Sequence, residues 1–413
     1  MTQAHPHTAL LPHSRRFLSL GALAIAAALS ACASKPGPWP ARALPPSAAV
    51  TADASLAGKL VLVEMPKVAW TGKVFHDSAV HMHDPQNAMG PETPYARPFQ
   101  MLGPFIALLD NLQTAGAAGV IVILDAPAST AYGLYAPYDG VVRQLPGVFV
   151  DRERVRRLRD SVLAGKPPAV RLTMDATVRQ VQTRNLVGII PGKSEELMVL
   201  ISHTDGPNAL EDNGPNAIVD MAQYLARLPQ DSLPRSIMLL LTSGHFAGGV
   251  GIEQFIDRHK DDGLTQRIAA TLSIEHLGAL EVLPDSNGYL RLTGRFEPAA
   301  LFSPRTPALM NAAYAMLKHA DAAPAFVLPP TNPGGDGSPK NAAWPGVGQY
   351  FWAAQRIPTM NYITGPNYLL NYGADAVTRV DYRLMQRQTV ALTQMLLDLS
   401  RVPYADLRKE TGP

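Results

Sequence analysis

The second half of the chain alternates short apolar runs with longer segments in which apolar residues recur every three or four positions. Short apolar runs that end abruptly in polar residues are typical of strands buried on both faces of a parallel sheet. The longer periodic segments are typical of helices with one buried face. Strands are expected at residues 198–201, 236–241, 269–274 and 357–362, and helices at residues 213–228, 251–259, 307–317 and 381–399. This alternation predicts an α/β domain over residues 179–402, with a mostly parallel central sheet and helices on both faces.

The first half of the chain contains a smaller set of elements with a similar alternation. Strands are expected at residues 59–64, 118–124 and 145–150, and helices at residues 104–115 and 152–164. Asp151 stands where it can cap the second of these helices. These elements predict a second, smaller α/β domain over residues 56–178, and residues 403–413 are expected to form a tail after the larger domain.

The N-terminal part has the features of an export signal. Arg15 and Arg16 precede an apolar segment over residues 20–29 that is too short to span a membrane as a stable helix. The sequence Leu29-Ser30-Ala31-Cys32 resembles the lipobox of bacterial lipoproteins, in which the leader is cut before the cysteine and the thiol receives lipid. We therefore expect a signal peptide over residues 1–31, a Pro- and Ala-rich tether over residues 32–55, and an exported chain held at the bacterial membrane by lipid. Ala33 after the cysteine favours the outer membrane, facing the periplasm or the cell surface.

The composition excludes several kinds of function. The 413 residues carry a formal net charge of +2, so there is no electrostatic case for nucleic-acid binding. Cys32 is the only cysteine, which excludes an intrachain disulfide and any zinc site built from cysteines. A group formed by His76, Asp77, His81, His83 and Asp84 has no standard metal-ligand spacing, so we expect it to lie in a solvated loop.

Candidate metal ligands follow the ends of the expected strands. His203, His245 and Glu275 each come after an apolar run, and Asp205 and Asp212 follow His203 in one loop. Because function in open α/β sheets lies beyond the C-terminal ends of the strands, these side chains are expected to converge. His203 and Asp212 can bind a metal, and Asp205 can accept the second ring N–H of His203 and fix its tautomer.

Several short motifs occur in the order found in one group of peptidases. They are Asn185-Leu186-Val187-Gly188, Pro191-Gly192, His203-Thr204-Asp205, Asp212-Asn213-Gly214, Thr242-Ser243-Gly244 and Ile357-Pro358. Over about residues 56–400 the chain resembles the zinc aminopeptidases with two co-catalytic metals, which include bacterial leucyl aminopeptidases, aminopeptidase Y and glutamate carboxypeptidase. Members of this family often carry a protease-associated domain, which residues 56–178 resemble. The resemblance implies a zinc-exopeptidase-like fold, peptide substrates and a zinc ion held by His203, Asp212 and Glu275.

The chain departs from this family at both ligands of the second metal. Where the family has paired glutamates, a general base and a ligand, this chain has His245 and Phe246. Where the family has its last histidine ligand, this chain has Asn371. One zinc ion is therefore favoured over two, and a chain without metal is the alternative. His245 is a replacement base, a fourth ligand or a filler of a dead site. His276 directly follows Glu275 and is expected to face the other way.

Two functions follow from these observations. The first is a lipid-anchored metallopeptidase, of the exopeptidase kind, in which one zinc ion acts on peptides with His245 and Asp205 as the catalytic side chains. The second is a catalytically degenerate relative that binds or scaffolds peptides without turnover. His203, Asp205, Asp212 and Glu275, which match the family that the chain resembles, favour the first, and the altered glutamate pair favours the second.

Overall fold

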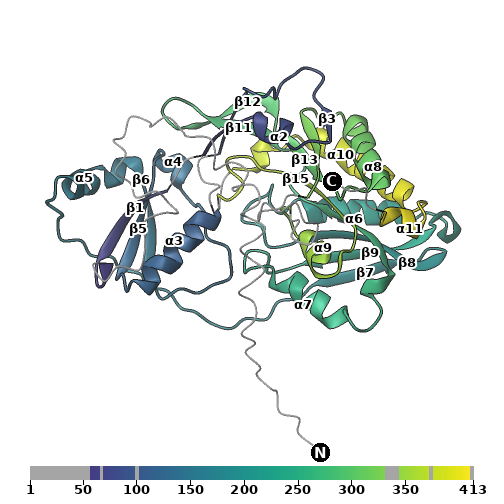
Figure 1. Ribbon diagram of the computed structural model, residues 1–413, viewed down its shortest axis with the longest axis horizontal. Helices are drawn as coiled ribbons and strands as arrows, with labels where there is room; N and C mark the ends of the chain where they lie inside the picture. The colour runs from purple at the N-terminus through teal and green to yellow at the C-terminus, as the bar shows by residue number, and fades with distance from the viewer. Residues whose placement is uncertain (1–55, 66–67, 98–101, 331–343, 372–374, 410–413) are drawn as a thin grey trace, which may run out of the picture.

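The computed structural model describes residues 56–65, 68–97, 102–330, 344–371 and 375–409. The expected signal peptide, Cys32 and the tether lie outside the described residues. The largest element is an eight-stranded sheet in the order β3-β14-β13-β15-β10-β8-β9-β7 (Figure 1). Its strands are β3 (His81–His83), β7 (Leu186–Ile190), β8 (Ser194–His203), β9 (Arg235–Thr242), β10 (Ile268–Ile274), β13 (Ala299–Phe302), β14 (Ala325–Leu328) and β15 (Thr359–Thr364). The strands β9, β8, β10 and β15 run parallel at its centre, and β3 and β7 join the edges antiparallel.

Helices cover both faces of this sheet, as the sequence predicts (Figure 1). They are α6 (Gly214–Leu225), α8 (Pro307–Ala320) and α10 (Tyr382–Leu399) on one face, and α7 (Val250–His259) and α9 (Gln349–Gln355) on the other. The central strand β8 shows why both faces need cover, because its side chains alternate between them. Met198 and Leu200 pack in the core beneath α6, whereas Val199 and Ile201 pack in the core beneath α7.

A smaller unit is built on the parallel sheet β1-β5-β6. It contains β1 (Leu60–Glu64), α3 (Leu102–Thr114), β5 (Gly119–Leu124), α4 (Ala128–Ala131), β6 (Gly147–Asp151) and α5 (Arg152–Leu163). Leu108 and Leu112 of α3 pack on Val120 and Val122 of β5. The side chain of Asp151 accepts hydrogen bonds from the first-turn backbone of α5, which confirms it as the cap.

The segment between β1 and α3 lies partly against the larger sheet. It contains β2 (Val68–Thr71), α2 (Lys73–His76), β3 and β4 (Pro94–Arg97), and β3 pairs with β14. The expectation of a solvated loop for its histidines is therefore wrong: His81 stacks on Tyr314 of α8 at 4.8 Å, and His76 Nε2 lies 2.8 Å from the carbonyl of Met89. A short strand whose residues pair with a partner distant in sequence gives little local signal. The boundary of the small domain stays a prediction.

The remaining elements connect the two units and close the fold. The hairpin β11 (Leu280–Pro284) and β12 (Leu290–Phe296) extends toward the small unit (Figure 1). Short 3-10 turns, η3 (Gln230–Ser232), η4 (Thr265–Arg267) and η6 (Val377–Arg379), lie in the connections. Residues expected as a tail include α11 (Tyr404–Leu407), whose Leu407 is buried in the main core. Among the described residues, no helix combines the length and the apolar character needed to cross a membrane.

Candidate metal centre

His203 ends the central strand β8 and is completely buried. The apolar run before it is fixed between β9 and β10, so the imidazole is presented at the C-terminal edge of the sheet. Its Nε2 lies 3.9 Å from Oε1 of Glu211 and 3.9 Å from Oε2 of Glu275. Burial, together with the nearby His245 and His276, holds the pKa of His203 well below its usual range. His203 is therefore neutral, which is the state in which an imidazole binds a metal.

Glu275 follows the neighbouring strand β10 and is fixed through one oxygen. Its Oε1 accepts hydrogen bonds from Ser273 Oγ at 3.0 Å and from the backbone N of Val347 at 2.9 Å. The other oxygen, Oε2, is left to face His203. Sequence reasoning placed Glu275 in this cluster correctly, because the residue after a parallel strand reaches the common edge.

His276 also belongs to the cluster, so the expectation that it faces away from Glu275 is wrong. The strand ends at Ile274, and His276 has a left-handed backbone with φ 59°. The alternation of a strand therefore no longer applies to it. Its Nδ1 lies 2.7 Å from the carbonyl of Thr364, and its Nε2 lies 4.0 Å from Oε2 of Glu275. A carbonyl can only accept, so Nδ1 carries a proton and Nε2 is directed into the cluster.

Glu211 is the residue that sequence reasoning missed. Its Oε2 lies 2.9 Å from Nε2 of His276. Burial lowers the pKa of His276, but the carboxylates of Glu211 and Glu275 outweigh it and raise that pKa to about 9. The side chain of Asn208 accepts from the backbone N of Glu211 at 3.2 Å and so shapes the loop. The only sequence signal was a second carboxylate directly before Asp212.

Asp205 and Asp212 lie beside this cluster. Asp205 Oδ1 is 3.7 Å from Nδ1 of His203, which is longer than a hydrogen bond, and its Oδ2 accepts from the backbone N of Phe246 at 3.2 Å. The pKa of Asp212 is raised to about 6, chiefly because the carboxyl is buried. A hydrogen bond from the backbone of Gly206 lowers this pKa, and the charges of Asp205 and Glu211 raise it further. The structure brings Glu211 rather than Asp212 to the imidazole of His203. The roles assigned to Asp205 and Asp212 stay predictions.

His245 lies directly over the cluster. Its ring stacks on that of His203, with centroids 4.3 Å apart and planes 17° apart. His203, Glu211 and His245 offer three ligand atoms within 4.8 Å of one another, as do His203, Glu275 and His276. Tyr138 of the small unit reaches the same place, with its ring 6.0 Å from that of His245. Burial raises the pKa of Tyr138, and the charges of Glu211 and Glu275 raise it further.

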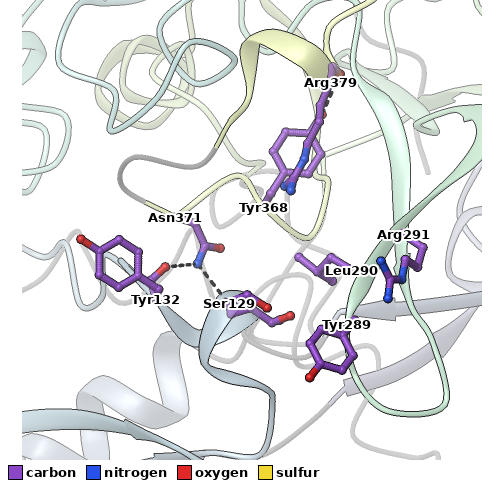
Figure 2. Close-up of a pocket in the computed structure, with 9 residues that line it drawn as sticks. Ser129, Tyr132, Tyr289, Leu290, Arg291, Tyr368, Asn371 and Arg379 are labelled. Atoms are coloured by element: carbon purple, nitrogen blue, oxygen red, sulfur yellow. Dashed lines mark hydrogen bonds between the residues drawn. The ribbon is translucent and has the colours of Figure 1, made fainter.

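Phe246 and Asn371, the two positions at which the sequence departs from the peptidases that it resembles, make other contacts. Phe246 is buried in a small apolar cluster with Leu370 and with Tyr138 and its neighbours in the small unit. Asn371 Nδ2 donates to the carbonyl of Tyr132 at 2.9 Å and to that of Thr130 at 3.2 Å (Figure 2). Both positions therefore connect the large sheet to the small unit.

The polar atoms of the cluster fit a metal ion. Buried atoms that make no hydrogen bond with the described residues are His203 Nδ1 and Nε2, Asp205 Oδ1, Asp212 Oδ1 and His245 Nδ1, whereas Glu211 Oε2 and His276 Nε2 are paired with each other at 2.9 Å. Buried polar atoms without partners are costly, and their concentration at one place fits a site whose donors bind an ion. Two imidazoles and one carboxylate are a known zinc set, and donors around a tetrahedral zinc lie roughly 3.4 Å apart. The separations of 3.9 and 4.0 Å from Glu275 Oε2 to His203 and His276 are close to this spacing.

Comparison with known proteins supports the fold. No family model matches the sequence, and no curated protein sequence is similar to it. The structure is similar to a peptidase M28 precursor from Shewanella amazonensis, with 12% identity, a TM-score of 0.53, and coverage of 87% of this chain and 71% of that one. A zinc aminopeptidase from Bacillus subtilis has 14% identity, a TM-score of 0.47, and coverage of 83% and 70%. An aminopeptidase from Aneurinibacillus sp. strain AM-1 has 12% identity, a TM-score of 0.43, and coverage of 72% and 65%.

The large sheet has a zinc-exopeptidase-like fold. At such low identity the likeness concerns the path of the backbone, so it assigns no activity to this chain. The site must be interpreted from its own side chains, and these are two buried imidazoles and two buried carboxylates at the edge where such folds bind ligands.

Proposed function

We propose that this protein is a metallopeptidase of the exopeptidase kind, which works on peptides with one zinc ion. The observation that carries the proposal is the group His203, Glu275 and His276, whose ligand atoms lie within 4.8 Å of one another at the edge of the sheet. Nε2 of His203 makes no hydrogen bond with the described residues, and Nε2 of His276 is paired with Oε2 of Glu211 at 2.9 Å. When bound, zinc supplies Lewis-acid polarisation of a carbonyl and lowers the pKa of a water molecule.

The residues of the chain prepare this site in separate ways. Ser273 and Val347 hold Oε1 of Glu275, so Oε2 is the oxygen presented to the ion. The carbonyl of Thr364 fixes the ring of His276 with Nε2 inward. Because these positions are set by neighbouring strands, the ligands need little rearrangement when the ion enters. The family-implied ligand Asp212 is the alternative third ligand in place of His276.

His245 is the proposed proton acceptor. It is half-buried, its Nδ1 has no hydrogen-bond partner among the described residues, and its ring lies against His203. Glu211 is the second candidate, but its Oε2 is occupied by His276 at 2.9 Å. Asp205, whose Oδ1 lies 3.7 Å from Nδ1 of His203, is the carboxylate that would orient the imidazole of a metal-bound His203.

The test measures zinc and turnover on the same preparations. We expect one equivalent of zinc per chain to remain after dialysis. We also expect the chain to release an amino acid from unblocked peptides, and a chelator to abolish this hydrolysis. His276→Ala and Asp212→Asn show whether His276 or Asp212 is the third ligand beside His203 and Glu275. Only the variant that removes the actual ligand should lower the zinc content. His259→Ala is the control, since that half-exposed histidine pairs with Asp262 away from the cluster. Two equivalents of zinc, or turnover indifferent to chelators, contradicts the proposal.

A binding protein without turnover is the second candidate function. The observation that favours it is the aromatic contact of Phe246 with Tyr135 and Tyr138, at ring separations of 5.2 and 5.1 Å, which places the small unit against the candidate site. Zinc content of one equivalent with no hydrolysis over the peptide panel, but with measurable peptide binding, supports this function over the first.

We also propose that the mature chain is anchored by lipid on Cys32 at the outer membrane. The support is the Leu29-Ser30-Ala31-Cys32 sequence after an apolar leader. One acyl chain binds a membrane only marginally, whereas several anchor it stably. A Cys32→Ala variant should leave the membrane fraction, and its full recovery there contradicts the anchor.

A further inference from the structure

A second site lies where the small unit meets the hairpin β11–β12 and the segment after β15. A pocket of about 220 Å³ is lined there by residues of α4, of β12 and of η6, together with Tyr368 and Asn371 (Figure 2). Thr130 Oγ1 donates to the carbonyl of Gly288 at 3.0 Å, which ties α4 to the turn of the hairpin. The walls therefore come from three segments distant in sequence, and the pocket exists only in the folded chain.

The charge of this pocket is positive. Arg291 and Arg379 line it, and its lining within the described part of the chain includes no acidic residue. The guanidinium of Arg379 lies over the ring of Tyr368, 4.8 Å from its centroid, and no ion pair of Arg379 occurs in the described part of the chain. Asp285 Oδ2 accepts a hydrogen bond from Nε of Arg291 at 3.2 Å, so the two terminal nitrogens of Arg291 are left to bind a ligand. Arginine forks are suited to carboxylates, because both oxygens can be bound at once.

An acceptor lies opposite these donors. Asn371 is 5% exposed, and both donor contacts of its Nδ2 go to backbone carbonyls of the small unit. Its Oδ1 is buried and has no hydrogen-bond partner among the described residues. Figure 2 shows this oxygen on the side of the amide that faces the pocket, away from Tyr132. A ligand N–H or O–H at this point would satisfy it, because a buried acceptor without a partner is costly.

The walls between the arginines and Asn371 are mostly rings and one aliphatic side chain, those of Tyr289, Tyr368 and Leu290. We propose that the pocket binds a small carboxylic acid that also carries a hydrogen-bond donor and an apolar body. The carboxylate would lie at Arg291 and Arg379, and the donor would face Asn371 Oδ1. An N-acylated amino acid and the C-terminal residue of a short peptide both have this chemistry. Binding there does not depend on the metal centre.

The test is calorimetric titration of the full mature chain with a chelator present, so that turnover cannot contribute. The probe is N-acetyl-leucine. The matched controls are its amide, which lacks the negative charge, and its N-methyl derivative, which lacks the N–H. We expect N-acetyl-leucine to bind at least about tenfold more tightly than either control, because a charge-assisted hydrogen bond is roughly twice as strong as a neutral one. A tripeptide ending in leucine distinguishes an N-acylated amino acid from the C-terminal residue of a peptide as the ligand. It should bind as tightly as N-acetyl-leucine only if the pocket is open to a longer chain.

Variants assign the binding to this pocket. Arg379→Gln should weaken N-acetyl-leucine binding by about tenfold or more, and Arg379→Lys should weaken it less, because the charge stays but the fork is lost. Arg401→Gln, on an exposed arginine after α10, is the control. Circular dichroism and the thermal midpoint establish that each variant is folded. Equal affinity for the acid and its amide, no binding of the acid at all, or binding unchanged by both Arg379 variants overturns the proposal. If the chain proves to have no peptidase activity, the proposed function fails, but the proposal that this pocket binds N-acetyl-leucine still stands.

Discussion

Two groups of residues at the same edge of the large sheet are used in different ways. The ligand atoms of His203, Glu275 and His276 lie within 4.8 Å of one another, and both ring nitrogens of the buried His203 make no hydrogen bond with the described residues. Phe246 and Asn371 have no such atoms directed at the cluster: one packs among apolar side chains, and the amide of the other donates to two carbonyls of the small unit. The first group has the features of a ligand site, and the second those of an interface between structural units.

The comparison shows how one sheet edge can hold a cluster of ligand-capable side chains beside a structural contact with a neighbouring unit. The resemblance to zinc aminopeptidases places second-metal ligands at positions 246 and 371, and both positions now hold the small unit in place. Glu275 and His276 are fixed instead by Ser273, Val347 and Thr364 of the large unit. Changes in the two groups should therefore have separable effects on zinc content and on stability.

The largest expected effect is on the metal group. His203→Ala removes the residue shared by both candidate ligand sets. Changes in residues that merely support ligands cost 10–100-fold in metal affinity, so we expect a loss of at least about 100-fold, with loss of any peptide hydrolysis. Zinc titration with a competing chelator measures it, and His259→Ala is the control. A His203→Ala chain that keeps full zinc affinity would show that the ion binds elsewhere.

Phe246→Ala should produce the opposite pattern. Removing a buried phenylalanine costs about 3 kcal/mol, because apolar contacts are lost and a cavity remains. We expect the small unit to loosen, with faster limited proteolysis and a lower denaturant midpoint, while zinc affinity changes little. Tyr132→Ala is the matched control, because it removes an aromatic ring of the small unit that is 75% exposed. A large loss of zinc with unchanged stability would place Phe246 in the metal group instead.

Asn371→Ala should have a smaller effect of the same kind. It leaves the carbonyls of Thr130 and Tyr132 without the amide donor, which costs about 1–3 kcal/mol where such groups are buried. Chemical denaturation measures the loss, and Asn287→Ala, an exposed asparagine in the hairpin turn, is the control. If Asn371→Ala were as stable as the parent chain, the interface role of this position would be wrong.

The smallest effect concerns the small unit alone. Asp151→Ala removes the cap of α5 and should cost about 1 kcal/mol with no change in zinc content. Burial raises the pKa of Asp151, but hydrogen bonds from Arg154 outweigh it and hold that pKa below its usual range. Because the folded pKa is below the unfolded value of about 3.9, the ionised cap stabilises fully above that pH. Its contribution is lost as the pH falls through the folded pKa, so parent and variant should converge in acid denaturation.

Sequence patterns predicted the regular elements of the large sheet well. The runs before His203 and Glu275 are long, apolar and bounded by polar residues, so their strand character and their common edge follow from local sequence. The short strands β3, β13 and β14 gave no comparable signal, because each has only three or four residues and is stabilised by partners distant in the chain. The helix cap at Asp151 was predictable because it depends on the next three residues alone.

The sequence by itself determined the α/β class, the strands that carry His203 and Glu275, and the two positions at which the chain departs from the peptidases that it resembles. Only the tertiary structure decided which neighbours join them. Glu211 reaches the cluster because Asn208 shapes its loop while donating to the carbonyl of Leu369, 161 positions further along the chain. His276 joins it because its backbone leaves the strand with a positive φ. Both depend on hydrogen bonds between segments distant in sequence, and local patterns of apolar and polar residues carry no information about such contacts.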